Sequence, residues 1–447
     1  MQVIKKTSYL KPLTKEFLEY LLPSISAMWV FSIYTMVDGM FVGKGIGPMA
    51  LASVNISMPF INMIFAISLI ISIGASTLIS FHLGGGEEKK SNEIFTLNII
   101  ILSFLGLIIS ILSLIYLEDL AIFLGASQET LLYVKDYLRL IIIFSPFFML
   151  AYSLEVLVKA DGFPVFAIVF VGLAAFINIL FDYIFVILLD YGVKGAAFAT
   201  GLSQFISCLG FLFHFIFGKS KLKLTHLKIS FSTLKSIFLI GFPDAITELS
   251  TGITVYLFNY MILKHIGNRG ITAFGVIMYV NNLVIMTMVA INQGMQPLVS
   301  FYHGKRDFIR IKKLLSLSFK TILLCSCLFV FVSQFFTDYL VSMFIDPSNL
   351  TVYQLSKKSL KIFSYSFMIC GINILLSGYF TALKETKKAS LISILRGLIV
   401  ITCFIFILPH FLGSFGIWIS SLLNEVFTLC ISLWTFFRFH NHLQKHL

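Results

Sequence analysis

Two polar side chains interrupt the apolar segment Phe176–Phe185, which reads FINILFDYIF. Asn178 and Asp182 stand four residues apart, so on a helix both side chains lie on one face, about one turn from each other. An Asp at the centre of a membrane helix costs roughly 2.5–3.5 kcal/mol, so it faces a bundle interior or a water-filled cavity rather than lipid. This pair therefore predicts a site that handles a proton, an ion or a charged ligand.

A second carboxylate, Asp38, interrupts the first apolar segment in TMVDGMFVG, and Thr200 interrupts the sixth in GAAFATG. If Asp38 and Asp182 share a pocket, one H⁺ or one Na⁺ would stabilise the two charges, and Asn178 and Thr200 would supply neutral oxygen atoms. The alternative is a pair of buried carboxylates satisfied by hydrogen bonds alone. We predict a cation-coupling site, which would also hold the metal ion if that ion is Na⁺, at Asp38, Asn178, Asp182 and Thr200.

Three glutamates also lie within apolar segments, in different surroundings. Glu155 can contact a cationic substrate, or it can pair with Lys159, four residues later on the same helix face. Glu248 has no basic neighbour at helical spacing and is a candidate for binding a cationic substrate or an ion, and Glu425 is a further intramembrane carboxylate. We add Tyr34 as a substrate-binding candidate, because Tyr, Phe and Met side chains beside carboxylates suit bulky lipophilic cations.

The elements that must position these residues are membrane helices. Of the 447 residues, 58% are hydrophobic and 12% charged, whereas soluble domains carry about 25% charged residues. The apolar runs are too long for buried core helices and lack the alternation of a transmembrane barrel. We therefore predict an all-α integral membrane protein of about twelve transmembrane helices. The expected spans are 16–43, 50–81, 93–117, 133–158, 165–188, 195–217, 236–263, 271–302, 315–336, 357–382, 390–410 and 415–437.

The formal net charge of +12 could suggest a nucleic-acid partner, but the basic residues concentrate in loops between the spans. They are densest in loops on the side of both termini, for example in residues 218–235 and 305–313. The tendency of cytoplasmic loops to carry Lys and Arg explains this pattern. We expect a monomeric, multi-pass protein of the cell membrane, in contact with lipid, with both termini in the cytoplasm and no nucleic-acid partner.

An internal repeat runs through the chain. Residues 71–84 read ISIGASTLISFHLG and residues 291–304 read INQGMQPLVSFYHG, with identical residues at six positions 220 apart. Pro23 and Pro243 keep the same spacing. Because the matches share one register along the chain, they predict two homologous halves of six spans each.

The repeat divides the chain into an amino-terminal half, 1–217, and a carboxy-terminal half, 236–447. The segment between them, 218–235, is basic and amphipathic, and we expect it on the cytoplasmic membrane surface. Halves with six spans each have the same orientation, a recurring transporter design with the substrate site between the halves. A channel would need a selectivity filter or a charged ring, and neither is evident in the sequence.

With its two halves and the motifs VDGMFVG, NILFD, GVKGAAFAT, SFHLG and SFYHG, the chain resembles the multidrug and toxic compound extrusion (MATE) transporters. The sequences VKADGFP (158–164) and FPDAITELS (242–250) look most like the bacterial branch that includes the staphylococcal MepA-type pumps. The resemblance covers nearly the whole chain. It implies a V-shaped twelve-helix antiporter that exports organic cations in exchange for H⁺ or Na⁺.

The resemblance also implies roles for residues. The family's amino-terminal cation site corresponds to Asp38, Asn178, Asp182 and Thr200. Some relatives instead use acidic residues in the seventh and tenth spans, and here Glu248 could serve in the seventh while 357–382 contains no Asp or Glu. That difference favours the amino-terminal site. The family's first helix is described as bent, and no Pro lies near Asp38, so Gly39 or Gly43 would permit the bend.

Three other functions compete with drug export. A lipid-linked oligosaccharide flippase of the same superfamily would carry extra spans and a cavity rich in Arg or Lys, and Arg396 is the one Arg placed well inside a predicted span. A metabolite exporter of the same fold stays open. A membrane enzyme would need clustered catalytic or metal-binding motifs, so we expect no enzyme and no cofactor other than the coupling ion.

Overall fold

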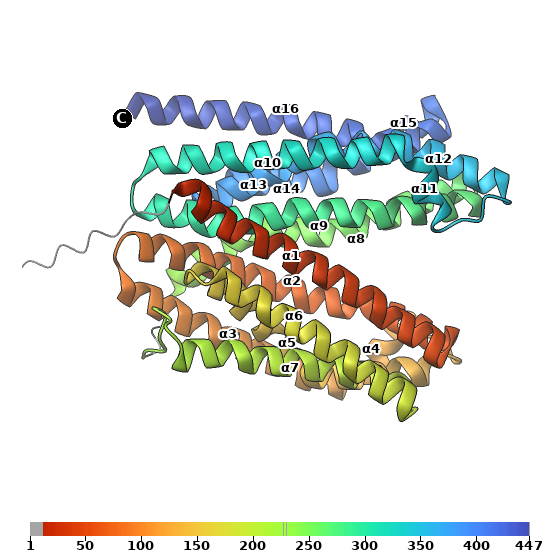
Figure 1. Ribbon diagram of the computed structural model, residues 1–447, viewed down its shortest axis with the longest axis horizontal. Coiled ribbons are helices and arrows are strands. Elements are labelled where there is room, and N and C mark those ends of the chain that lie inside the picture. Colours follow the sequence, from red (N-terminus) through yellow and green to blue (C-terminus); the bar gives the residue numbers. More distant parts are fainter. Residues whose placement is uncertain (1–11, 227, 229, 447) are drawn as a thin grey trace, which may run out of the picture.

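The computed structural model describes residues 12–226, 228 and 230–446, which form long helices joined by short loops (Figure 1). The all-α prediction is confirmed. In chain order the α-helices and three π-helical segments (η) are α1 Leu13–Met40, η1 Phe41–Ile46, α2 Pro48–Gly84, α3 Glu88–Ile115, α4 Leu117–Phe123, α5 Leu131–Ala160, α6 Pro164–Asp182, η2 Tyr183–Leu188, α7 Gly192–Phe217, α8 Phe231–His265, α9 Asn268–Gly304, α10 Phe308–Phe335, α11 Thr337–Ser342, α12 Leu350–Ser364, α13 Phe367–Ala382, α14 Thr386–Ile394, η3 Leu395–Ile399, α15 Val400–Leu412 and α16 Ser414–His446.

Ten helical spans among the described residues are long and apolar enough to cross a bilayer. An eleventh consists of α12 and α13, which are bent by 42° relative to each other, so the straight span predicted over 357–382 is wrong in shape. The remaining predicted span corresponds to α8, which is 35 residues long but less apolar because it carries Asp244 and Glu248. The twelve predicted spans thus all correspond to helices.

The internal repeat recurs in the helix boundaries. Helices α2 and α9 both contain 37 residues and begin 220 residues apart, and α3 and α10 both contain 28 residues with the same displacement. Figure 1 shows the helices in two groups, which we call the first bundle (α1–α7) and the second bundle (α8–α16). The first turns of α1 lie against the second bundle, and the helix then crosses into the first.

The two bundles meet at one end and diverge toward the other (Figure 1). At the closed end the backbones of α2 and α9 touch reciprocally: a Cβ atom on Gly84 would lie 1.9 Å from the Phe301 carbonyl oxygen, and one on Gly304 would lie 1.8 Å from the Phe81 carbonyl oxygen. These four residues are related in pairs by the 220-residue repeat. Small residues allow this contact because they let helix backbones approach closely without side chains between them.

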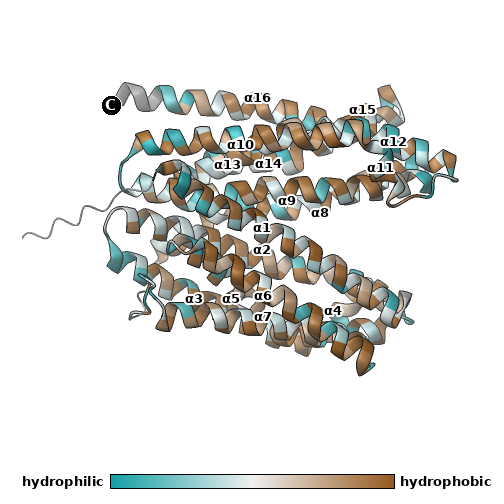
Figure 2. Ribbon diagram, viewed as in Figure 1, coloured by the Kyte–Doolittle hydropathy of each residue, from teal (hydrophilic) through white to brown (hydrophobic). Residues whose placement is uncertain are grey.

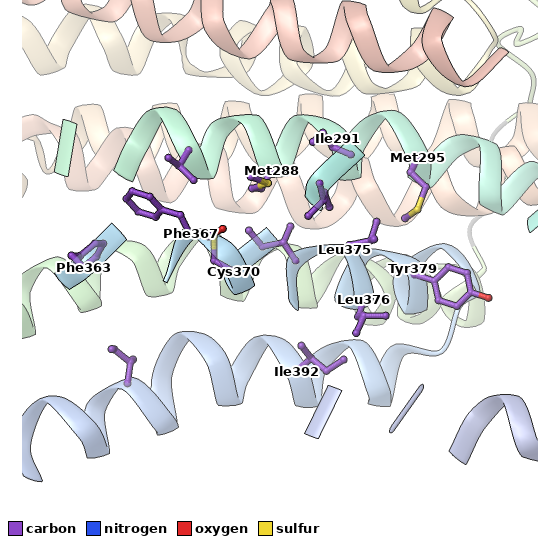
Figure 3. Close-up of a cluster of buried hydrophobic side chains, with 14 of the residues drawn as sticks. Met288, Ile291, Met295, Phe363, Phe367, Cys370, Leu375, Leu376, Tyr379 and Ile392 are labelled. Carbon is purple, nitrogen blue, oxygen red and sulfur yellow. The ribbon is translucent and has the colours of Figure 1, made fainter. Parts of the chain in front are cut away.

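Each bundle has an apolar core and an apolar outer surface. In the second bundle, Met288, Ile291 and Met295 of α9 pack toward side chains of α13 such as Leu375 (Figure 3). Figure 2 shows hydrophobic residues along the helices and hydrophilic residues gathered at the loops. Exposed large apolar side chains recur at helical spacing on the outer helices, including Phe104, Leu107 and Ile111 of α3. These surfaces suit contact with lipid.

The connection from α7 to α8 is tied to the first bundle. Asp161, in the loop after α5, accepts a hydrogen bond from the Lys221 amide (3.0 Å), and its other oxygen lies 3.2 Å from His214 Nε2. The amides of Lys223 and Thr225 donate to side chains of α3. Burial raises the pKa of the Asp161 carboxyl because it disfavours the charged form. These contacts offset that penalty and hold the described part of the connection in place.

Candidate functional site

The two predicted carboxylates lie at places where α-helix gives way to π-helix. Asp38 precedes the start of η1 by three residues, and Asp182 is the last residue of α6, directly before η2. The two π-helical segments pack together at Gly45, where a Cβ atom would lie 2.9 Å from Ile187 Cδ1. Single π-helical turns inside α-helices are frequent at functional sites because they displace side chains from the regular helical register.

The amino-terminal residues predicted from sequence come together in the first bundle. The side chains of Asp38 and Asp182 are neighbours. Asn178 Nδ2 donates to Thr200 Oγ1 (3.4 Å), and that hydroxyl donates to the Ala196 carbonyl (3.0 Å). Asp182 and Asn178 are buried, at 0% and 1% exposure, and Asp38 is half-buried. We call this group the carboxylate site.

Several oxygen atoms of the carboxylate site have no hydrogen-bond donor among the described residues. They are Oδ1 and Oδ2 of Asp182, Oδ1 of Asp38 and Oδ1 of Asn178. Leaving a buried carboxylate unpaired is strongly unfavourable, so these oxygens require a proton or a cation. Carboxylate, amide and hydroxyl oxygens are also the atoms that a hard cation prefers, so the group fits either H⁺ or Na⁺.

Tyrosines and phenylalanines extend from the carboxylate site into the first bundle. Tyr34 of α1 and Tyr137 of α5 both lie within electrostatic range of Asp38 and Asp182. Tyr34 packs edge-on against Phe31, and further edge-to-face contacts continue through Phe65 to Phe148 and Tyr152. Tyr137 was not predicted from sequence, because a tyrosine in an apolar span carries no distinguishing pattern.

Glu155, predicted to bind substrate or to pair with Lys159, forms the pair. Lys159 Nζ donates to Glu155 Oε1 at 2.7 Å, and the two side chains are 3% and 16% exposed. Lys159 also lines a small cavity between the bundles, together with Ser76 of α2 and Gln293 and Gln296 of α9. The ion pair therefore lies at the junction of the two bundles.

In the second bundle, Glu248 is exposed and lines a pocket together with Asp244, which the sequence analysis did not select. Asp244 accepts hydrogen bonds from Gln296 (3.2 Å) and Thr381 (3.3 Å). The signal was available, because Asp244 is a carboxylate in the same apolar span, next to Pro243. Glu425, in contrast, is held in an ion pair by Arg396.

Comparison with known proteins identifies relatives over most of the chain. The MatE family model matches residues 23–184 and 243–407. The Multidrug export protein MepA of Staphylococcus haemolyticus (strain JCSC1435) is 25% identical over 431 residues, covering 96% of this chain and 94% of the relative. MepA of Staphylococcus aureus (strain NCTC 8325 / PS 47) is 26% identical over 424 residues, covering 94% and 92%.

Solved structures share the fold. One is described as the outward-facing conformation of a multidrug resistance MATE family transporter of the MOP superfamily, with a TM-score of 0.89, 22% identity, and coverage of 95% of this chain and 96% of that one. Another, a MOP superfamily transporter from Pyrococcus furiosus described as having reverse polarity of its binding pocket, has a TM-score of 0.89, 22% identity and 98% coverage of both chains. The match of the family model to most of the sequence shows that this chain belongs to the MATE family of multi-span membrane transporters.

Proposed function

We propose that this protein is a secondary antiporter that exports organic cations from the cell in exchange for H⁺ or Na⁺. The observation that carries the proposal is the carboxylate site, where buried oxygens of Asp38 and Asp182 have no donor among the described residues. A proton or Na⁺ entering the site would neutralise part of that charge. The names of the MepA relatives, multidrug export proteins, support the direction of transport and the substrate class.

The distribution of basic residues supports an orientation. The α2–α3 and α9–α10 connections at the closed end carry Lys89, Lys90, Lys305 and Arg306. Cytoplasmic loops carry an excess of Lys and Arg, so the closed end faces the cytoplasm, with both termini, and the bundles diverge toward the outside. Residues 1–217 and 236–447 act as the two lobes, joined by 218–235. A single chain holds every proposed site, so a monomer suffices for transport.

Helix α1 provides a route from ion binding to lobe movement. Its far end carries Asp38, while nearer its start Trp29 Nε1 donates to Thr287 Oγ1 of α9 at 3.1 Å. Leu21 lies against α9 at Gly294, where a Cβ atom would lie 3.3 Å from the Leu21 Cα. Neutralising the carboxylate site changes the packing of α1 against α6, and α1 transmits that change to α9. Coupling then requires that the ion and the substrate prefer opposite states.

The substrate class follows from the lining of the first bundle. The edge-to-face aromatic series from Tyr34 to Tyr152 offers π-faces to a lipophilic cation, and Glu155 lies one turn beyond Tyr152. Glu248 supplies an exposed carboxylate from the second bundle. Aromatic faces with a few carboxylates suit bulky organic cations better than strongly hydrated small ones.

The test is ethidium transport into or out of proteoliposomes that contain the purified protein, under an imposed pH or Na⁺ gradient. Wild type is expected to move the dye under one of the two gradients, which identifies the ion. Asp38→Asn and Asp182→Asn remove the charge without changing side-chain size, so each is expected to lower gradient-driven transport at least tenfold. The control is Asp119→Asn, an exposed residue of α4, which is expected to transport like wild type.

Two results would contradict the proposal. Wild-type protein that moves no cationic dye under either gradient rules out cation export. Transport that is driven by a gradient but is unchanged in both variants shows that the two carboxylates are structural and that the coupling ion binds elsewhere.

A further inference from the structure

A polar pocket in the second bundle has no role in the ion coupling proposed above. Residues of α8, α9, α13, α14 and η3 line it, and Leu69 and Ile73 of α2 close it on the side of the first bundle. It therefore opens toward the space between the two bundles, where a substrate would lie. Its polar lining includes Asp244, Glu248 and Arg396. The pocket thus presents charges of both signs, unlike the carboxylate site.

The positive charge is held in a fixed orientation. Arg396 Nε donates to Glu425 Oε1 (2.9 Å) and Oε2 (3.1 Å), and Nη2 lies 2.9 Å from Oε1. Asn373 Nδ2 donates to the same carboxylate at 2.8 Å, and Ser432 donates to Asn373. Glu425 does not line the pocket, so it anchors one edge of the guanidinium from behind. The Nη1 atom of Arg396 makes no hydrogen bond within the described part of the chain, and it remains available as a donor.

Acceptors also face this pocket. Glu248 has no hydrogen-bond partner among the described residues. Asn292 is 4% exposed and lines the pocket, and its Oδ1 atom is buried without a donor. Asp244 is engaged by Gln296 and Thr381, which leaves part of its acceptor capacity unused. An unsatisfied buried acceptor together with a free guanidinium edge indicates a ligand that both donates and accepts.

A structural parallel links this pocket to the carboxylate site. Arg396 is the second residue of η3, and Asp38 and Asp182 adjoin η1 and η2. All three π-helical segments among the described residues thus lie within three residues of an intramembrane charge. Because a π-helical turn displaces side chains from regular register, η3 is the local device that turns Arg396 toward the pocket.

We propose that this pocket is a subsite for the polar end of an amphoteric substrate, one that carries both an organic cation and a carboxylate. Arg396 binds the carboxylate through its free edge, and Glu248 and Asn292 bind the donor groups of the cation. The body of the ligand lies between the bundles. The proposal deepens the export function above, because it assigns a carboxylate-recognising residue to a transporter whose other proposed contacts all favour positive charge.

The test compares two fluorescent dyes that differ in one group. One is an amino-rhodamine with a free carboxylate (the acid dye), and the other is its methyl ester (the ester dye). Binding to the purified full-length protein is measured by fluorescence anisotropy without any ion gradient. Wild type is expected to bind the acid dye at least about tenfold more tightly, since a hydrogen bond to a charged group is stronger than one to a neutral ester.

The key variant is Arg396→Gln combined with Glu425→Gln, which removes both charges and leaves neither partner unpaired. We expect it to lower affinity for the acid dye about tenfold and to change affinity for the ester dye by less than about twofold. Glu248→Gln is expected to weaken both dyes. Arg438→Gln, on the last turns of α16, is the matched control and leaves both affinities unchanged. Equal losses for both dyes in the double variant, or no preference in wild type, would overturn the proposal.

Wild-type protein gives a second readout that does not depend on folding of a variant. The guanidinium reagent phenylglyoxal is applied in the presence of either dye, and modification of Arg396 is followed by mass spectrometry. Protection by the acid dye but not by the ester dye supports the subsite, and equal protection contradicts it. Because both assays measure binding, a dye preference without gradient-driven transport would refute the antiporter proposal and leave this inference standing.

Discussion

At the scale of single residues, the intramembrane charges divide into paired and unpaired groups. Glu155 is paired with Lys159, and Glu425 with Arg396. Asp182 has no donor for either oxygen among the described residues. A paired charge is structurally satisfied, whereas an unpaired buried carboxylate is strongly unfavourable until a proton or cation arrives. This difference, rather than the presence of a carboxylate, separates the candidate for ion coupling from the others.

The Glu155–Lys159 pair leads to a prediction for cation affinity. In Lys159→Met the Glu155 carboxylate loses its partner and becomes available to a positively charged ligand. We expect ethidium to bind about three- to tenfold more tightly, since an added negative charge attracts the dye through a partly screened medium. Fluorescence titration of the purified protein measures this. Unchanged affinity would show that Glu155 does not face the substrate.

The same variant tests the structural role of the pair. Removing one member of a buried pair commonly destabilises a protein by about 3–5 kcal/mol, so the melting temperature should fall. Glu155→Gln combined with Lys159→Met should recover most of that loss and bind ethidium no more tightly than wild type does. Lys194→Met removes a lysine from a more exposed pair and serves as the control.

At the scale of elements, the α7–α8 connection is more ordered than its composition suggests. Five lysines between residues 218 and 235 predict a solvated, membrane-surface segment. Instead, the amides of Lys221 and Lys223 donate to Asp161 and Asn92 of the first bundle, and Leu222 between them is fully buried. The connection therefore moves with the first bundle, and the hinge between the bundles lies closer to the start of α8 at Phe231.

Asp161 provides the test of this attachment. In Asp161→Ala the Lys221 amide and His214 lose their shared partner, so residues 219–223 should detach more often. We expect tryptic cleavage at Lys219, Lys221 or Lys223 to become several-fold faster in the detergent-purified protein. Asp161→Asn keeps an oxygen acceptor for the Lys221 amide and should be cleaved at nearly the wild-type rate. Equal rates in all three proteins would mean that Asp161 does not hold the connection.

At the scale of the whole molecule, the two bundles meet through backbone contacts related by the repeat. Gly84 and Gly304 face the Phe301 and Phe81 carbonyls, and Gly241 of α8 faces Ile70 of α2, where a Cβ atom would lie 1.8 Å from the carbonyl oxygen. Around this seam Lys384 of the second bundle lies 3.2 Å from the centre of the Phe81 ring. Glycine is required here because any side chain would force the helices apart.

A methyl group at this seam should therefore open the closed end. Gly84→Ala or Gly304→Ala is combined with a single cysteine at Ser76, between the bundles, after replacement of the six native cysteines. We expect a water-soluble maleimide to modify that cysteine several-fold faster than in the background protein. Gly275→Ala, where a Cβ atom meets nothing within 4 Å, is the control. Unchanged reactivity in both seam variants would show that the glycines do not close this end.

Much of the architecture follows from the sequence alone. Long apolar runs can only be satisfied in lipid as helices, so composition determined the all-α membrane fold, and the motif ISIGASTLISFHLG with its counterpart 220 residues later revealed the repeat. Asp38, Asn178, Asp182 and Thr200 could be selected as candidates because a polar side chain at membrane depth is unfavourable wherever it lies. These properties depend on local composition and spacing.

What the sequence left open depends on which helix faces meet. Glu155 had two possible roles, and the tertiary structure places Lys159 beside it; Glu425 was a candidate until Arg396, 29 residues earlier, proved to be its partner. Asp244 stood in plain view, but its place in a pocket is visible only once α8, α9 and α13 are packed together. The π-helical turns beside Asp38, Asp182 and Arg396 have no sequence signature either. A charge announces itself in an apolar segment, but its partner is chosen by packing between distant helices, which no local pattern records.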